Sequence, residues 1–201
     1  MTNWVRGEGA MRSWQRYAIA VAGGLAAGLG AAWALTNGGL GDGAIRNGPW
    51  TTSLGYGTRA TDPLTRAMVA RSGLLALPAR ETIYWMAKTD AGGAPLDGNC
   101  RYSLSGGALD ARWWSVTLYD AKGYLVANPA DIWSVNGANA PLDDRGIWRV
   151  IISPDKPADG QWLPGTKGQP FHLTLRMYNP GAAFRASPSS AALPRIVKEG
   201  C

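Results

Sequence analysis

The sequence has 201 residues, of which 27 are Gly, 13 are Pro and only 17% are charged. This composition favours a domain of short strands joined by tight turns, and it argues against a helical bundle. The net charge of +6 would suit nucleic acid or an anionic membrane surface. However, the basic residues are scattered and no nucleic-acid motif is present, so we expect no nucleic-acid partner.

An uncharged apolar run extends over residues 17–35. As a helix with a rise of about 1.5 Å per residue it would span roughly 28 Å, close to the hydrocarbon thickness of a bilayer. Arg6, Arg12 and Arg16 precede the run, so the positive-inside rule predicts a cytoplasmic tail over residues 1–16. We therefore expect a single-pass helix in the lipid bilayer of a bacterial inner membrane, with the rest of the chain in the periplasm.

A cleaved signal peptide is the alternative to this anchor. The segment Ala32–Ala34 resembles the small-x-small site at which signal peptides are cut, although the apolar run is long for a signal peptide. Both interpretations place the domain that follows outside the cytoplasm.

Gly24 and Gly28 form a GxxxG pattern within the apolar run. Small residues allow two helices to approach closely in lipid, where packing must drive their association. The pattern predicts a contact with a transmembrane helix partner, although a helix rich in Ala and Gly also produces it through composition alone.

Residues 36–59 are rich in Gly and lack a periodic apolar pattern, which predicts a linker. Asp62 and Pro63 then suit the cap and the first position of a helix. The apolar residues that follow predict one buried helical stripe, on a helix that covers an end or edge of a sheet. The stripe comprises Leu64, Ala67, Met68, Leu74 and Leu75.

The apolar spacing changes to two from Glu81 onward, which is typical of strands with one buried face. The predicted strands cover residues 81–88, 99–104, 112–120, 124–127, 131–135, 147–153 and 171–178. We expect the strand over residues 112–120 to be the central one, with residues 124–127 as its hairpin partner. Short strands at this spacing predict a mostly β domain over residues 60–201, an antiparallel β-sandwich or jelly roll.

Several motifs of this domain, in order along the chain, resemble the DUF1214 family. They are Leu96–Gly98, Tyr102, Trp114–Asp120, Trp162–Pro164 and Arg176–Tyr178. The resemblance covers roughly residues 60–201 and is closest to the short, membrane-anchored bacterial form. Gln161 and Gly165 depart from the family pattern, which usually has Asn and Pro around Trp-Leu-Pro. The resemblance implies a β-sandwich of the jelly-roll type, and it implies no activity and no catalytic residues.

The two cysteines, Cys100 and Cys201, predict a disulfide, because an exported domain folds in an oxidising compartment. Closing a loop of about 100 residues stabilises a fold by up to roughly 4–5 kcal/mol in the chain-entropy model. The bond would also hold residues 185–200, which otherwise form a loose tail, against the sheet. Two free thiols are the alternative.

Large polar and aromatic side chains on the outward-facing positions of two strands are the candidates for ligand binding. They are Trp113, Tyr119, His172, Arg176 and Tyr178, with Tyr84 and Tyr102 as further candidates. Together they would form a groove for a glycan or a lipid headgroup; the alternative is that the helix and the loops cover them. Asp120 and Arg176 end long strands, and we expect them to form an ion pair.

No catalytic constellation can be recognised in the sequence. It has a single His and no Gly-x-Ser-x-Gly elbow, and a zinc site needs three or four N or S ligands, so we expect no cofactor and no metal. The predicted function is a binding or accessory module of the cell envelope, in one version a subunit of a membrane complex. The alternative is a hydrolase of envelope glycans or lipids that uses two facing carboxylates.

Overall fold

The computed structural model describes residues 12–38, 44–58, 61–71 and 73–201. Most of the predicted cytoplasmic tail and part of the predicted linker, residues 1–11, 39–43 and 59, lie outside the described residues. The chain divides into two compact units, Met1–Leu40 and Gly41–Cys201.

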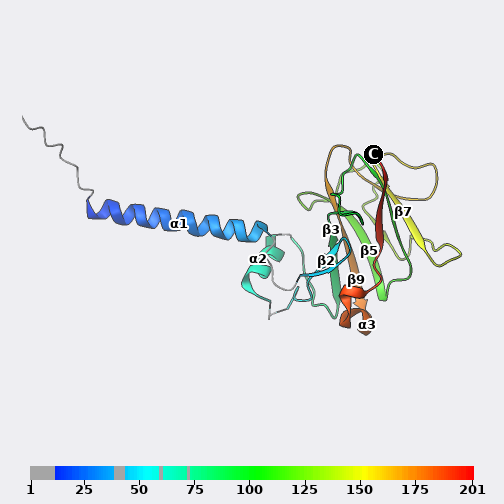
Figure 1. Cartoon of the computed structure of the whole chain (residues 1–201), viewed down its shortest axis with the longest axis horizontal. Helices are drawn as coiled ribbons and strands as arrows, with labels where there is room; N and C mark the ends of the chain where they lie inside the picture. The colour runs from blue at the N-terminus through cyan, green and yellow to red at the C-terminus, as the bar shows by residue number, and fades with distance from the viewer. Residues whose placement is uncertain (1–11, 39–43, 59–60, 72) are drawn as a thin grey trace, which may run out of the picture. The chain divides into compact units, whose positions relative to one another are not determined.

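The first unit contains one long helix, α1 (Ser13–Gly38) (Figure 1). Its segment Ser13–Thr36 is long and apolar enough to cross a membrane, and none of it is buried in the structure. A single N-terminal helix that could span a membrane is therefore present, as the sequence predicts. An added Cβ at Gly24 or Gly28 would meet nothing within 4 Å, so both glycines lie open on the surface of α1.

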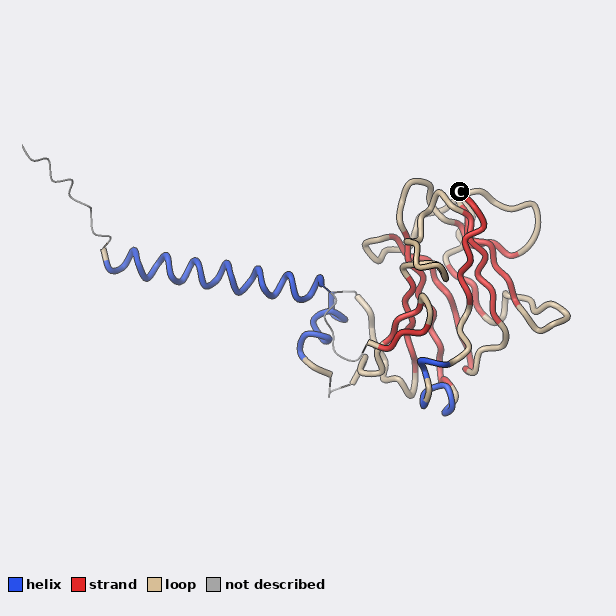
Figure 2. The backbone as a smooth tube through the Cα atoms, in the orientation of Figure 1, coloured by secondary structure: helices blue, strands red, loops and turns tan. Residues whose placement is uncertain are grey.

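The second unit contains two β-sheets that lie face to face (Figure 1, Figure 2). The first sheet has the order β1-β2-β3-β9-β5-β6, and all its neighbours are antiparallel. The second has the order β10-β4-β7-β8, with a parallel β7–β8 pair. The strands of the first sheet are β1 (Ile45–Asn47), β2 (Trp50–Thr52), β3 (Thr82–Ala87), β5 (Ala111–Asp120), β6 (Ser134–Asn136) and β9 (Phe171–Pro180). Those of the second are β4 (Arg101–Gly106), β7 (Trp148–Ser153), β8 (Gln161–Pro164) and β10 (Arg195–Gly200). The predicted mostly β, two-sheet fold is confirmed.

The core lies between the two sheets and consists of the inward-facing residues of both. Trp114 on β5 stacks on Trp148 of β7, with ring centroids 4.7 Å apart, and so joins the sheets directly. Tyr102 on β4 meets Phe171 on β9 edge-to-face at 5.7 Å. Burying each large apolar side chain stabilises the fold by about 1.5–3 kcal/mol. The unusual number of Trp in the sequence, 10, is thus explained in part by this core.

Strand β9, not β5, is the central long strand of the first sheet, because β9 pairs with β3 on one side and β5 on the other. The outer neighbour of β5 is the short β6. The predicted hairpin partner over residues 124–127 makes only one bridge, between Tyr119 and Leu125. The Asp120 amide donates to the Tyr124 carbonyl at 2.9 Å, and no strand follows over residues 126–133, so the hairpin stays short.

Two predicted loose segments are parts of the sheets. Within the predicted linker, β1 and β2 extend the first sheet, and Trp50 is buried with its indole N–H donating to the Pro194 carbonyl at 2.7 Å. In the predicted tail, β10 pairs with β4, and Ile196 is buried. Each segment is ordered by a partner far away in the sequence, which a local pattern does not reveal.

The predicted stripe of the first domain helix is only half-buried at residues 64, 67, 68 and 74, and none of its five residues belongs to the core. Helix α2 (Pro63–Arg71) begins as expected, with the Asp62 carboxylate accepting the Thr65 amide at 2.9 Å. It ends before the apolar residues of its predicted last turn, so Leu75 is 92% exposed, and the buried residue of α2 is Thr65. The helix that reaches the core is α3 (Ala182–Ala186), which places Phe184 against Trp85. A 3-10 turn, η1 (Pro188–Ser190), follows it.

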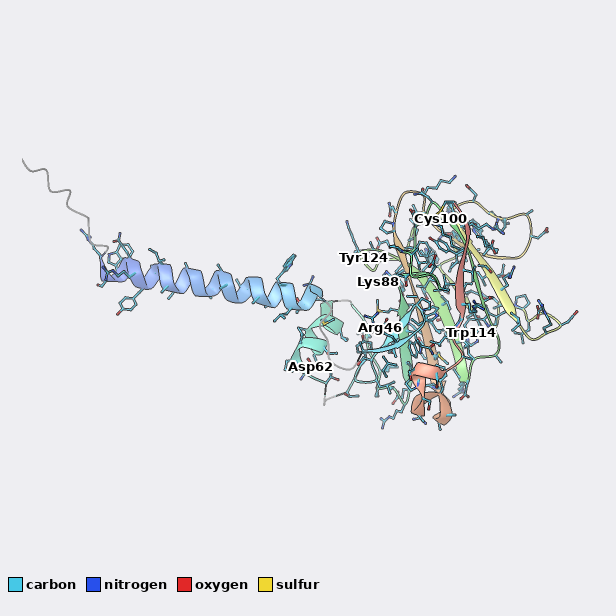
Figure 3. The ribbon with its side chains drawn as sticks, viewed as in Figure 1. Arg46, Asp62, Lys88, Cys100, Trp114 and Tyr124 are labelled. Atoms are coloured by element: carbon cyan, nitrogen blue, oxygen red, sulfur yellow. A yellow bond between two sulfur atoms is a disulfide. The ribbon has the colours of Figure 1, made fainter. Side chains whose placement is uncertain are left out.

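The structure contains the Cys100–Cys201 disulfide that the sequence predicts. It joins the start of β4 to the end of β10, at the opposite end of the sandwich from α3 (Figure 1, Figure 3). The bond therefore fastens the C-terminal strand to the second sheet.

Replacing both cysteines by Ser is expected to lower the free energy of unfolding by about 2–5 kcal/mol. The physical reason is that the bond closes a loop between residues 101 positions apart and thereby restricts the unfolded chain. Urea denaturation of the full chain in detergent, followed by near-UV circular dichroism, measures the change. Reduced wild-type protein serves as the matched control and should unfold like the double variant. Equal unfolding midpoints for oxidised and reduced wild type would contradict the expectation.

Candidate functional site

The face of the first sheet that points away from the core carries polar and aromatic side chains, and we call it the outer face. On β9 the residues alternate, so that Leu173, Leu175 and Met177 are fully buried in the core. The residues between them share the outer face with those of β5 in four cross-strand pairs. These pairs are Trp113–Tyr178, Ser115–Arg176, Thr117–Thr174 and Tyr119–His172. The structure thus brings all five predicted ligand-binding residues onto one surface.

Arg176 lies in the middle of the outer face, and its guanidinium is held by β5. One terminal nitrogen donates to the Tyr119 hydroxyl at 2.8 Å and the other to the Thr117 hydroxyl at 3.3 Å. The guanidinium carbon also lies 5.5 Å from the centroid of the Tyr119 ring, within the range of a cation–π contact. Three contacts from two residues therefore fix the direction of this side chain.

The expected Asp120–Arg176 ion pair does not form. The Asp120 carboxylate accepts the amides of Lys122 and Tyr124, both at 2.8 Å, and these bonds satisfy it within its own turn. The hydrogen bond from the Tyr124 amide is the largest of the effects that lower the pKa of Asp120. Arg176 makes no ion pair with any residue that the structure describes.

At one end of the outer face Tyr119 and His172 stack, with ring centroids 5.5 Å apart and an interplanar angle of 18°. His172 is only 9% exposed. Burial lowers its pKa below the ordinary value of 6.5, and the nearby charge of Lys88 lowers it further, while Asp120 acts in the opposite direction. The imidazole is therefore neutral at pH 7, and it lies where an added negative charge would favour its protonation.

At the other end Trp113 and Tyr178 meet at 5.4 Å with their rings tilted by 56°. Trp113 is 42% exposed, a large share for this side chain in a folded domain. On β9, Tyr178 lies six positions after His172, so the outer face extends for about 20 Å along the strand. An aromatic pair at each end and a cation between them can hold an extended ligand that carries a negative charge.

The two further candidates, Tyr84 and Tyr102, are not available for binding. Tyr102 lies on the second sheet and is fully buried in the core, with its hydroxyl oxygen accepting the Asp97 amide at 2.9 Å. Tyr84 shares the outer face, but its hydroxyl donates to the Leu75 carbonyl and accepts from the Leu77 amide. The segment after α2 therefore covers Tyr84 and part of this face. Much of the rest is buried as well, which agrees with the alternative of a covered surface at Ser115, Thr117, His172 and Thr174.

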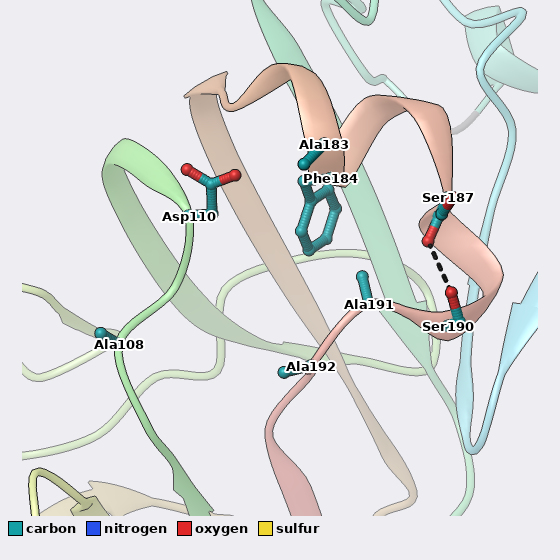
Figure 4. Close-up of a pocket in the computed structure, with 8 residues that line it drawn as sticks. All are labelled: Ala108, Asp110, Ala183, Phe184, Ser187, Ser190, Ala191 and Ala192. Carbon is teal, nitrogen blue, oxygen red and sulfur yellow. Dashed lines mark hydrogen bonds between the residues drawn. The ribbon is translucent and has the colours of Figure 1, made fainter.

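A depression of about 290 Å³ lies elsewhere, beside α3 (Figure 4). It is lined by Ala108, Asp110, Ala183, Phe184, Ser187, Ser190, Ala191 and Ala192. None of the predicted ligand-binding residues lines it, and Asp110 is its only charged lining group. The sequence contains no signal for this depression, because it forms where distant segments meet.

The described residues include no group of three or more His, Cys, Asp or Glu that could hold a metal ion. Two carboxylates of the domain, Asp120 and Asp143, each accept backbone amides of their own turns. Asp143 also pairs with Arg145 at 3.1 Å. Asp120 and Asp143 therefore do not supply the two facing carboxylates, free of other bonds, that a hydrolase would need.

Comparisons with known proteins agree with the resemblance in the motifs. The family model described as "Protein of unknown function (DUF1214)" matches residues 81–182. The chain is similar in fold to the VPA0106 protein from Vibrio parahaemolyticus, with 23% identity and a TM-score of 0.58. That match covers 69% of this chain and 36% of the Vibrio protein, so the chain spans little more than a third of that protein's length.

A weaker similarity, with 16% identity and a TM-score of 0.44, joins the chain to an uncharacterized protein from Burkholderia cenocepacia. It covers 59% of this chain and 30% of the other. No curated protein sequence matches the chain.

Titration of His172 gives the fold a specific pH dependence. The pKa of His172 is lowered in the folded state, so the unfolded chain binds the proton first as the pH falls. The contribution of His172 to the stability of the fold is therefore present above about pH 6.5. It is lost as the pH falls toward the folded-state pKa. The lowered pKa values of Asp62, Asp120 and Asp143 act only below about pH 4. The groups around the imidazole are Lys88, Tyr119 and Asp120.

We therefore expect the thermal unfolding temperature to fall between pH 7 and pH 5, and the His172→Gln variant to show a flatter slope over that window. Differential scanning calorimetry of both proteins measures it. Identical slopes would show that another group titrates there.

Proposed function

The chain belongs to the DUF1214 family, whose description assigns no function, and we propose that it is a membrane-anchored binding module of the cell envelope. In this proposal α1 crosses the bacterial inner membrane with its N-terminus in the cytoplasm. The sandwich then lies in the periplasm, where it acts as a binding or accessory module.

Two observations support the proposed location. Arg12 and Arg16 lie at the N-terminal end of an apolar helix that has no charged residue in its last turn, which is the charge bias of a helix with a cytoplasmic N-terminus. The Cys100–Cys201 disulfide belongs in an oxidising compartment, and the bacterial periplasm is one.

One observation carries the proposed binding role: between two aromatic pairs, the outer face holds a fixed arginine that makes no ion pair with a described residue. Stabilising the fold alone would favour an arginine that is paired with a carboxylate, or its replacement by an apolar residue. Exposed aromatic side chains next to Arg are typical of binding surfaces. The hydrolase alternative gains no comparable support, because Asp120 and Asp143 are committed to their own turns.

The export of the domain can be tested by topology reporters. Alkaline phosphatase fused after Cys201 is expected to be active in bacterial cells, because that enzyme needs an oxidising compartment to form its own disulfides. A green fluorescent protein fused at the same position, which folds in the cytoplasm, is the matched control and should stay dark. Bright fluorescence together with an inactive phosphatase would place the domain in the cytoplasm and end the proposal.

The subunit version of the proposal concerns the open glycines of α1. Replacing Gly24 or Gly28 by Leu is expected to weaken association of the helix by an order of magnitude, because close approach of two backbones requires small residues. A membrane reporter of helix association measures it, with the Gly23→Leu and Gly30→Leu variants as controls on the same helix. Equal association of wild type and all variants would show that the GxxxG pattern is compositional.

A further inference from the structure

Arg176 is held differently from the cations of the domain that form ion pairs. The four ion pairs of the described residues involve Arg80, Arg101, Arg145 and Lys167, which are all substantially exposed. Arg176 is half-buried, and its two hydrogen bonds go to hydroxyl groups. A guanidinium has five N–H donors, so three of them make no bond to a described residue. Arg176 is thus oriented by the protein while most of its donors stay available.

A second cation lies at the same end of the outer face. Lys88 directly follows β3, whose last residue, Ala87, pairs with Leu173, so Lys88 lies next to His172 across the strands. Its charge acts on the His172 imidazole, which shows their proximity independently. Lys88 is exposed, and it lies toward the end of the sandwich that carries Cys100 (Figure 3).

The carboxylates nearby are hydrogen-bonded to backbone amides of their own turns. Asp120 accepts the amides of Lys122 and Tyr124. Asp90, which is buried, accepts the amides of Gly92 and Ala94 at 2.9 and 3.0 Å. Neither makes an ion pair with Arg176 or Lys88. Neither cation at this end of the outer face therefore has one of these two carboxylates as a direct partner, and both lie near the Tyr119–His172 stack.

We infer that Arg176 and Lys88, with the Tyr119–His172 stack, form a binding site for a phosphate group of an envelope ligand. A planar guanidinium with N–H groups to spare matches the oxygens of a phosphate, and such charge-assisted bonds are stronger than neutral ones. Lys88, which is exposed, supplies a second positive charge, and the Tyr119–His172 stack borders the site. This inference rests on the proposed binding role of the outer face and specifies its ligand chemistry.

The phosphate can come from a lipid headgroup or from a soluble phosphodiester, and the two sources can be separated. The full chain in neutral detergent is titrated with glycerophosphoglycerol in one arm and with micelles doped with phosphatidylglycerol in the other. Calorimetry measures Kd in both arms. Binding in the lipid arm alone assigns a lipid headgroup, and equal binding in both arms assigns the phosphodiester itself.

The Arg176→Gln variant is expected to raise Kd by about 10-fold or more in whichever arm binds, because it removes the charge and the paired donors. Lys88→Gln should raise it by up to about 5-fold. Lys156→Gln removes an exposed positive charge elsewhere on the domain and should leave Kd unchanged. Near-UV circular dichroism checks folding, and the Arg176→Lys variant, which keeps the charge, should bind with intermediate affinity.

A phosphodiester keeps a constant charge between pH 7.5 and 5.5, so its binding reports the titration of the protein alone. Protonation of His172 adds a third positive charge beside Lys88, near Asp120, so Kd should fall as the pH is lowered, and His172→Gln should remove this dependence.

Absence of binding in both arms, or an Arg176→Gln variant with the wild-type Kd, would overturn the inference. The topology reporters test the location of the domain, and the binding measurements test the phosphate site. A failure of the phosphate site can therefore be distinguished from a failure of the proposed location.

Discussion

The position of β9 between β3 and β5 is the constraint on which the rest of the domain depends. Along β9 one set of residues, including Leu173, Leu175 and Met177, fills the core, and the other set builds the outer face. A shift of the strand by one residue would exchange the two sets and place Arg176 between the sheets. Burial of the apolar set therefore fixes the register, and the register in turn fixes the candidate site.

The ends of the strands at Lys88 and His172 are fixed by the segment that precedes Cys100. The Leu96 amide donates to the Lys88 carbonyl, and the Leu96 carbonyl accepts the Phe171 amide. Gly98 packs so closely that a Cβ there would overlap the carbonyl oxygen of Thr166. The same segment leads into the disulfide. The bond that fastens the C-terminal strand thus also supports the charged end of the outer face.

The sequence predicts those parts of the fold that depend on alternation within one strand. This includes β3, β5, β7 and β9 and the residues shared by the outer face. The disulfide is predicted separately, from the two cysteines of an exported domain. The sequence does not predict β1, β2 and β10, because strands of this kind are ordered by partners far away in the sequence. The same limit explains the exposed Leu75, which lies beyond the end of its helix, and Arg176, whose partners are hydroxyl groups on the neighbouring strand and not Asp120.

The central claim is that the outer face, and no other surface of the sandwich, contacts a component of the envelope. Photo-crosslinking in living cells tests it, with a photoreactive amino acid at Trp113 and, as the control, at Leu142, an exposed apolar residue before β7. The account predicts an adduct from position 113 that is lost when Arg176→Gln is added, and none from position 142. Equal adducts from both positions, or none from position 113, would contradict it.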